Sequence, residues 1–235
     1  MHTEQQTIIR KLMHYPGLTF NELWNKEGVS SAFAYHLKTL CEQGLVEKKD
    51  EMYYLSSQGK SHATYVEGES GKEGKFPLIG IVVLVYDAIT NRYLLMKRLK
   101  EPFYGYWGFH GGKVKFNQYI LECAEQELRE ETGLECDLEL RGLFSGKTYN
   151  NGKLAYNHQM FIIKATNPRG TLLEKTREGI NQWFSLEEIN DLQAFPNVPE
   201  SIKIIHSTHF RWVEADRIQE NDVFKELTIL KDKEI

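Results

Sequence analysis

Residues 111–134 read GGKVKFNQYILECAEQELREETGL, a double glycine followed by a segment with the pattern of a helix. Near its end lie Glu127, Glu130 and Glu131, which share one helix face because positions i, i+3 and i+4 are neighbours on a helix. Gly133 is placed to end that helix in the left-handed conformation. The three carboxylates then repel one another and oppose the helix dipole in its last turns. The stretch therefore predicts a helix whose charge needs a compensating partner.

A divalent cation is the natural partner for this cluster of carboxylates. Oxygen ligands suit a hard ion such as Mg²⁺ or Mn²⁺. The alternative is a solvated acidic face, since Glu125 and Arg129 form an ordinary i, i+4 pair on the same helix. The glycines favour the metal, because Gly111 and Gly112 let the backbone approach a metal or a phosphate closely.

The spacing of this stretch resembles the signature of the Nudix hydrolases, which runs from a glycine through a set of glutamates to a second glycine. The positions that match it in register are Gly112, Glu127, Leu128, Glu130, Glu131, Gly133 and Leu134. Two positions depart from it, since the first Glu of the signature is Gln118 here and its Arg is Gln126. Both members of a charged pair are thus replaced by amides that can bond each other. We expect the scaffold to be kept and the electrostatics of the ligand cluster to change.

The resemblance covers about residues 76–215 and implies an α/β fold, a Nudix-type α/β/α sandwich with a mixed sheet. It also implies that glutamates of the helix and the carbonyl of Gly111 hold Mg²⁺ or Mn²⁺ against a pyrophosphate, so that an activated water attacks phosphorus. The family often supplies a further carboxylate from a loop, for which Glu178 is the candidate and a plain surface role the alternative. The predicted metal ligands are Gly111, Glu127, Glu130 and Glu131, and the predicted catalytic residues are Glu127, Glu130, Glu131 and Glu178.

An aromatic and glycine-rich loop precedes the double glycine. Trp107 and Phe109 are candidates for stacking on a base or sugar, with core packing as the alternative. His110 stands where the family often has proline, and it either contacts a phosphate or is a simple loop residue. We therefore expect Trp107, Phe109, His110 and Gly112 to bind a nucleotide-like substrate.

The composition of the 235-residue chain is that of an ordinary globular protein, with 41% hydrophobic and 26% charged residues and a formal net charge of −4. The cysteines, Cys41, Cys123 and Cys136, show neither metal-ligand spacing nor an even disulfide framework, which predicts a reducing cytoplasm. The beginning of the sequence has no apolar signal core, and no stretch approaches the roughly 20 apolar residues of a membrane span. We therefore expect a cytoplasmic protein with no membrane partner.

A change of composition divides the chain. The run VEGESGKEGK at residues 66–75 holds three glycines and alternating charge, which predicts a flexible linker over 67–75. We expect an N-terminal unit at 1–66, a Nudix domain at 76–220 and a C-terminal tail at 221–235.

Apolar and β-branched residues predict the strands of the second unit. Residues 78–86 form a run typical of a central strand buried on both faces. A hairpin partner is predicted at 93–97, with further strands at 138–144 and 158–164. Ser185 and Glu188 form a capping-box pair that predicts a helix start.

The N-terminal unit resembles a small α+β domain of the winged helix-turn-helix class. An amphipathic helix is predicted around Ile8, Ile9 and Leu12, and Thr19 with Glu22 forms a capping-box pair for a second helix. Ser30 or Ser31 is expected to cap a third helix, and short strands are predicted around residues 45–49 and 52–55.

In such a domain the third helix reads the DNA major groove with its N-terminal half, and the wing adds phosphate contacts. The expected DNA contacts are Ser30, Ser31, Tyr35, His36, Lys38, Lys48 and Lys49. Residues 1–66 carry equal numbers of basic and acidic residues, so the cations must gather on one face to bind double-stranded DNA. The alternative is a winged helix that forms a homodimer or contacts another protein.

Two functions remain open at this point. The first is a metal-dependent hydrolase that cleaves the pyrophosphate bond of a nucleoside diphosphate linked to another moiety, with a DNA-binding regulatory module. The second is a transcription regulator in which a degenerate Nudix domain senses a nucleotide-like ligand without turnover. The retained glutamates favour hydrolysis, whereas Gln118 and Gln126 favour sensing.

Overall fold

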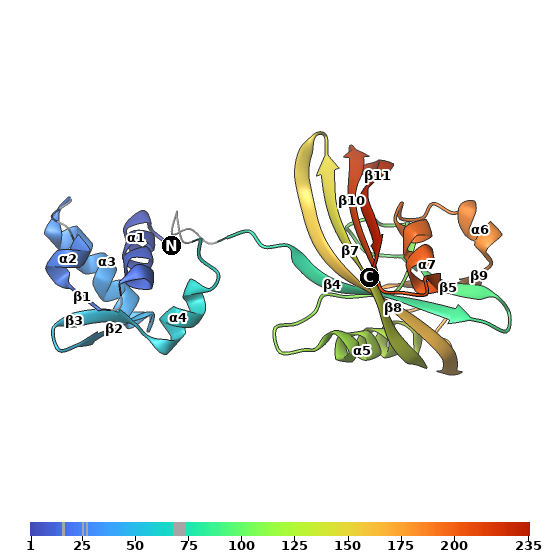
Figure 1. The fold of residues 1–235 in the computed structure, drawn as a ribbon, viewed down its shortest axis with the longest axis horizontal. Coiled ribbons are helices and arrows are strands. Elements are labelled where there is room, and N and C mark those ends of the chain that lie inside the picture. Colours follow the sequence, from blue (N-terminus) through green and yellow to red (C-terminus); the bar gives the residue numbers. More distant parts are fainter. Residues whose placement is uncertain (16, 25, 27, 68–73) are drawn as a thin grey trace. The chain divides into compact units, whose positions relative to one another are not determined.

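The structure is a computed structural model of the chain. It describes residues 1–15, 17–24, 26, 28–67 and 74–235. The expected linker over 67–75 lies for the most part outside these described residues. The chain divides into two compact units, Met1–Phe76 and Pro77–Ile235, whose elements are drawn in Figure 1. Among the described residues no helix has the length and apolar character needed to cross a bilayer.

The first unit combines helices with a small antiparallel sheet of strand order β1-β3-β2. Its elements are α1 (Thr3–His14), β1 (Leu18–Thr19), α2 (Phe20–Trp24), α3 (Ser30–Glu42), β2 (Val46–Lys49), β3 (Met52–Leu55) and α4 (Ser57–Ala63). Helix α1 buries Ile8, Ile9 and Leu12 in the core of this unit, as its amphipathic pattern predicts, and α3 adds Leu37 and Leu40.

Of the two helix starts predicted in the first unit, that of α2 is capped as expected and that of α3 is not. The N–H of Thr19 donates to the Glu22 carboxylate at 2.7 Å, and the N–H of Glu22 donates to the Thr19 hydroxyl at 3.4 Å, which is the predicted capping box. The expected cap of α3 at Ser30 or Ser31 is wrong. Val29 is the residue before the helix and makes no side-chain cap bond, so Ser30 and Ser31 are helical residues.

The second unit is a mixed sheet with helices on both faces. Its elements are β4 (Leu78–Asp87), β5 (Arg92–Arg98), β6 (Trp107–Gly108), α5 (Ile120–Thr132), β7 (Leu134–Asn150), β8 (Lys153–Gly170), β9 (Gly179–Phe184), α6 (Leu186–Asn190), α7 (Val198–His206), β10 (Arg211–Glu220) and β11 (Val223–Glu234). The eight-stranded sheet runs β11-β10-β7-β8-β4-β5-β6, with β9 paired to β5. The pairs β4–β8 and β7–β10 are parallel and the others are antiparallel.

Two hydrophobic layers flank this sheet. Strand β4 contributes Ile81 and Val83 to the layer under α5, whereas its Leu84 belongs to the layer that includes Ile204 and Ile205 of α7. Figure 1 shows α5 and α7 on opposite sides of the strands. The predicted central strand and the predicted sandwich with a mixed sheet are thus present, since β4 is buried on both faces.

The end of the chain differs from the sequence-based expectation. Residues 221–235 were expected to form a tail, but β11 pairs antiparallel with β10 along nearly its whole length. Most side chains of β11 are exposed, although the segment carries the apolar residues Val223, Phe224, Leu227, Ile229 and Leu230. Backbone hydrogen bonds hold it to the sheet, and Arg211 donates twice to Asp232 at 2.6 and 2.5 Å.

Candidate functional site

Helix α5 carries the carboxylates to the edge of the core. Leu128 is buried against the sheet, and on the same helix Glu131 is only 4% exposed. Glu127 is half-buried and Glu130 is exposed. Gly133 ends the helix with φ 71°, which is the left-handed conformation predicted for it. The local sequence thus positions three carboxylates on one helix with increasing burial, from exposed Glu130 through Glu127 to buried Glu131.

The double glycine lies between α5 and β4. N–H groups of β4 donate to the carbonyls of His110 and Gly112 at 2.8 and 2.9 Å. Between these two residues, Gly111 turns its N–H and its carbonyl away from β4, because backbone polar groups alternate in an antiparallel pair. Its N–H donates to the Glu131 carboxylate at 3.1 Å. The Gly111 carbonyl therefore lies on the side of the chain that faces the glutamates.

Close packing explains why both positions are glycine. A Cβ built on Gly112 would lie 2.3 Å from the carboxyl carbon of Glu127. A Cβ built on Gly111 would lie 2.2 Å from the carbonyl oxygen of Ile81. Any side chain at either position would displace a carboxylate of the cluster or the backbone of β4.

Burial and mutual repulsion dominate the electrostatics of the cluster. Burial raises the pKa of Glu131 to about 8, the Gly111 N–H opposes this rise, and the charge of Glu127 adds to it. Burial also raises the pKa of Glu127, and the charges of Glu130 and Glu178 raise it further. Carboxylates that raise one another's pKa are the arrangement that a bound divalent cation relieves.

Glu178 completes the cluster from the residue before β9. It forms an ion pair with Lys100, and the N–H of Leu99 donates to its carbonyl at 2.9 Å. The hydrogen bond from Lys100 lowers the pKa of Glu178, which therefore stays ionised beside partners of raised pKa. Its charge raises the pKa of both Glu127 and Glu131, so the structure brings this loop carboxylate close to α5.

The two glutamines that depart from the signature bond each other. Gln118 donates through its amide to the Gln126 carbonyl oxygen at 2.9 Å. Gln126 in turn donates to the Glu130 carboxylate at 2.7 Å. The expected bond between the two amides is thus present, and Gln126 also holds the Glu130 carboxylate.

The expected phosphate contact of His110 is not supported by its position. His110 is 0% exposed, and burial lowers its pKa to about 4. Its Nε2 lies 3.0 Å from the amide oxygen of Asn181 on β9. Asn181 donates to the carbonyls of Glu131 and Leu173, both at 2.7 Å. His110 and Asn181 therefore anchor the end of α5 from within the core. Sequence reasoning missed Asn181, whose only signal is a polar residue inside a strand.

The aromatic residues of the loop pack inward. Trp107 lies edge-on to Phe184 with ring centroids 4.9 Å apart, and Phe109 lies edge-on to Tyr93 at 6.5 Å. Both are half-buried against the hydrophobic layer on the α7 side of the sheet. Their packing corresponds to the core alternative.

The expected DNA contacts lie on α3 and on the β2–β3 hairpin. Ser30, Ser31, Tyr35, Lys38, Lys48 and Lys49 are exposed, and His36 is half-buried. The three lysines each have a carboxylate partner: Lys38 with Glu42 at 3.6 Å, Lys48 with Glu51 at 2.8 Å and Lys49 with Glu47 at 2.7 Å. These surface pairs are weak, so a phosphate can replace the carboxylate, but they reduce the positive potential of the face.

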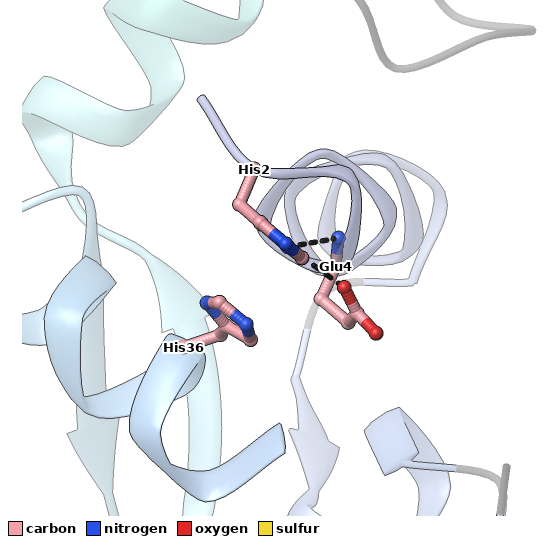
Figure 2. A group of neighbouring side chains, drawn as sticks. All are labelled: His2, Glu4 and His36. Atoms are coloured by element: carbon pink, nitrogen blue, oxygen red, sulfur yellow. Dashed lines mark hydrogen bonds and ion pairs between the residues drawn. The ribbon is translucent and has the colours of Figure 1, made fainter. Parts of the chain in front are cut away.

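His36 also belongs to a cluster that the sequence did not reveal. Its ring stacks on that of His2 with centroids 4.2 Å apart and an interplanar angle of 14°. Figure 2 shows these rings beside Glu4, whose carboxylate oxygen lies 2.7 Å from His2 Nδ1. The three ligand atoms lie within 4.8 Å of one another, a donor set that transition metals favour. The parallel rings do not direct their nitrogen lone pairs at a common centre, so one ring would have to turn to bind a metal.

Comparison with known proteins places the second unit in a family. Residues 77–207 match the NUDIX domain. The uncharacterized Nudix hydrolase YvcI of Bacillus subtilis is 28% identical over 102 residues, which are 43% of this chain and 63% of that protein. The chain thus spans less than two thirds of the length of this relative. The oxidized purine nucleoside triphosphate hydrolase of Mus musculus is 30% identical over 146 residues, which are 59% of this chain and 90% of that protein.

A solved structure agrees with these sequence relatives. The MutT protein from Bacillus halodurans has 25% sequence identity and a TM-score of 0.54, over 66% of this chain and 96% of that one. The family match includes the double glycine, all of α5 and Glu178, and it covers more than half of the chain. The chain therefore belongs to the Nudix hydrolase family, with its carboxylate cluster inside the matched domain.

Proposed function

We propose that the second unit is a metal-dependent pyrophosphohydrolase that cleaves the pyrophosphate bond of a nucleoside diphosphate linked to another moiety. The observation that carries this proposal is the buried carboxylate of Glu131, held by the Gly111 N–H at 3.1 Å among other carboxylates that raise its pKa. Such a cluster destabilises the fold unless a cation or a proton neutralises it. Relatives of this chain are named as hydrolases, one of them of oxidized purine nucleoside triphosphates.

The donor set fits a hard divalent ion, which members of this family generally use. Glu127, Glu130 and Glu131 offer carboxylate oxygens, and the Gly111 carbonyl lies on the same side of the chain. When bound there, Mg²⁺ or Mn²⁺ supplies charge neutralisation for phosphate oxygens and lowers the pKa of a water molecule. The glycines leave room for this group, since any Cβ on Gly112 would collide with Glu127.

The protein's own residues then position the substrate and move the proton. Lys100 holds Glu178 ionised in the absence of substrate. When a substrate phosphate draws Lys100 away, the pKa of Glu178 rises and the carboxylate becomes a better acceptor for the proton of the attacking water. A glutamate of α5 that is not fully engaged as a ligand is the alternative base. The hydrogen bond from Gln126 to Glu130 keeps that carboxylate oriented without adding charge.

The proposal is tested by product release from a panel of pyrophosphate compounds. The panel contains ADP-ribose, sugar nucleotides, dinucleoside polyphosphates and nucleoside triphosphates, each with Mg²⁺, with Mn²⁺ and with EDTA. We expect turnover of at least one class with metal and none with EDTA. Nucleotide binding in the absence of any turnover would contradict hydrolysis and support a sensor.

For the first unit we propose double-stranded DNA binding by a winged helix-turn-helix domain. The supporting observation is that the N-terminal half of α3 exposes Ser30, Ser31 and Tyr35, and that the β2–β3 hairpin follows α3 in the chain. The paired lysines predict weak, salt-sensitive affinity. Fluorescence anisotropy with a genomic DNA fragment at two salt concentrations tests this. Homodimer formation without DNA affinity, measured by light scattering, would support the alternative use of this fold.

A further inference from the structure

Gln219 lies in β10 with both polar atoms of its side chain unpaired. It is 1% exposed, and neither its amide nitrogen nor its amide oxygen has a hydrogen-bond partner among the described residues. A buried amide without partners is unfavourable, because it loses its bonds to water and gains none in return. The side chain therefore offers a donor nitrogen and an acceptor oxygen to a group that binds there.

Arg217, two positions earlier on the same face of β10, is also incompletely partnered. Its guanidinium donates to Nδ1 of His158 at 3.1 Å and to the amide oxygen of Asn197 at 3.4 Å, while its Nε has no partner. Burial lowers the pKa of Arg217 to about 10, and burial followed by the charge of Arg217 lowers that of His158 to about 4. The buried cation is thus held by neutral groups and retains an unused donor.

A chain of aromatic contacts links the neighbours of these two polar residues. Phe224 of β11 is the ladder partner of Gln219, and its ring lies 5.2 Å from that of Phe103. Phe103 also contacts Tyr156 at 5.8 Å, and Tyr156 stacks at 5.8 Å on His158, the partner of Arg217. The remaining walls of the cluster are Tyr106 and Phe195.

The loop between β5 and β6 connects this cluster to the carboxylates. Lys100 at one end of the loop pairs with Glu178, and Phe103, three residues later, packs on Phe224. A substrate that contacts the metal-binding glutamates through its phosphates can therefore reach the aromatic cluster through its other end. In the structure the rings touch one another, so a ligand would enter by displacing one of them. Phe103 is the ring to displace, because it lies in a loop and not in a strand.

We propose that this cluster binds the purine base of the substrate, with Gln219 and Arg217 as the residues that determine base specificity. The proposal rests on the hydrolase function and names the substrate class of that site. A base matches the flat aromatic walls, and adjacent donor and acceptor groups on a purine edge match the amide of Gln219. Arginine and glutamine are the side chains that pair with guanine and adenine edges, so the shared chemistry is that of a purine. Both residues lie in β10, beyond the residues 77–207 that match the family.

The first test is binding of nucleoside monophosphates, which contain no pyrophosphate bond and cannot be turned over. Isothermal titration of the full chain with AMP, GMP, CMP and UMP is compared between wild type and Gln219→Met. We expect AMP or GMP to bind on the order of tenfold more tightly than the pyrimidine nucleotides, and this preference to vanish in Gln219→Met. Which of the two purines binds more tightly identifies the base.

Matched variants separate this proposal from the hydrolase function. Gln182→Met changes an exposed glutamine of β9 and should leave the preference unchanged. Glu131→Gln should retain the purine preference even where turnover is lost. Phe103→Ala, a loop change that leaves the strands intact, removes the ring that a ligand must displace and should tighten purine binding. Equal affinity for purines and pyrimidines in wild type, or a preference that survives in Gln219→Met, would overturn the proposal; a purine preference without any turnover would overturn the hydrolase function alone.

Discussion

The protonation of Glu131 makes a prediction about stability in the absence of metal. Glu131 is 4% exposed, and its pKa rises from 4.5 to about 8 in the folded chain. Between these two values the unfolded state is ionised and the folded state holds the proton, so folding takes up one proton. The contribution of Glu131 to stability is therefore most favourable at low pH and falls as the pH rises from 4.5 through 8. Glu131→Gln removes this dependence, since the amide is neutral and its oxygen can still accept from the Gly111 N–H.

The size of the effect follows from linkage. Each pH unit between the two pKa values lowers the free energy of unfolding by about 1.4 kcal/mol. At pH 7 the loss relative to low pH is about 3 kcal/mol. For a domain of this size each kcal/mol corresponds to roughly 2–4 °C in the melting temperature. Glu131→Gln should therefore melt about 6–12 °C above wild type at pH 7 in EDTA.

Calorimetric melting of both proteins between pH 5 and 8 measures this difference. The second unit is assigned by its own transition, and Glu125→Gln, an exposed change on the same helix, serves as the control. The difference in melting temperature between Glu131→Gln and wild type should increase with pH in EDTA. It should decrease when Mg²⁺ is added, because the ion neutralises the wild-type carboxylate. A difference in melting temperature that does not change with pH would refute the claim that Glu131 is buried and holds a proton in the folded state.

The remaining predictions concern the double glycine, the glutamine pair and the core beneath α5. Gly112→Ala places a methyl group 2.3 Å from the carboxyl carbon of Glu127, so metal-dependent turnover should fall at least tenfold while the fold survives; activity within twofold of wild type would show that the carboxylate can move aside. Gln118→Glu combined with Gln126→Arg should tighten Mg²⁺ affinity in activity titrations, and each single change should be worse than the pair because it leaves one charge without its partner. Asn181→Leu loses two hydrogen bonds of 2.7 Å to backbone carbonyls and should lower stability by about 1–3 kcal/mol in urea unfolding, whereas an unchanged midpoint would remove its anchoring role.

The local features of α5 were predictable because short-range rules determine them. The spacing of Glu127, Glu130 and Glu131, and the left-handed Gly133, follow from helix geometry and the conformational freedom of glycine. The hydrogen bond between Gln118 and Gln126 was expected from the resemblance, because both members of a charged pair are replaced by complementary amides. These features depend on residues close together in sequence.

Features that depend on distant parts of the chain were missed or misjudged. His110 resembles a surface loop residue in sequence, yet a strand about 70 residues away buries it through Asn181. The start of α3 was placed at a serine because serine is a good cap, but the helix begins after Val29. Strand β11 has mostly exposed side chains and is held by its pairing with β10, although its apolar residues were not recognised as a strand in the sequence. Gln219 is unusual only because tertiary packing excludes its partners.

Turnover by three variants of one helix tests the metal-dependent hydrolase most directly. Wild type, Glu131→Gln and Glu125→Gln are assayed side by side, with the pyrophosphate compound that wild type turns over, in Mg²⁺ and in EDTA. We predict that wild type and Glu125→Gln hydrolyse it only with Mg²⁺, and that Glu131→Gln loses at least a hundredfold in kcat while it remains folded. Equal turnover by Glu131→Gln, or hydrolysis that continues in EDTA, would contradict a catalytic metal at the carboxylates of α5.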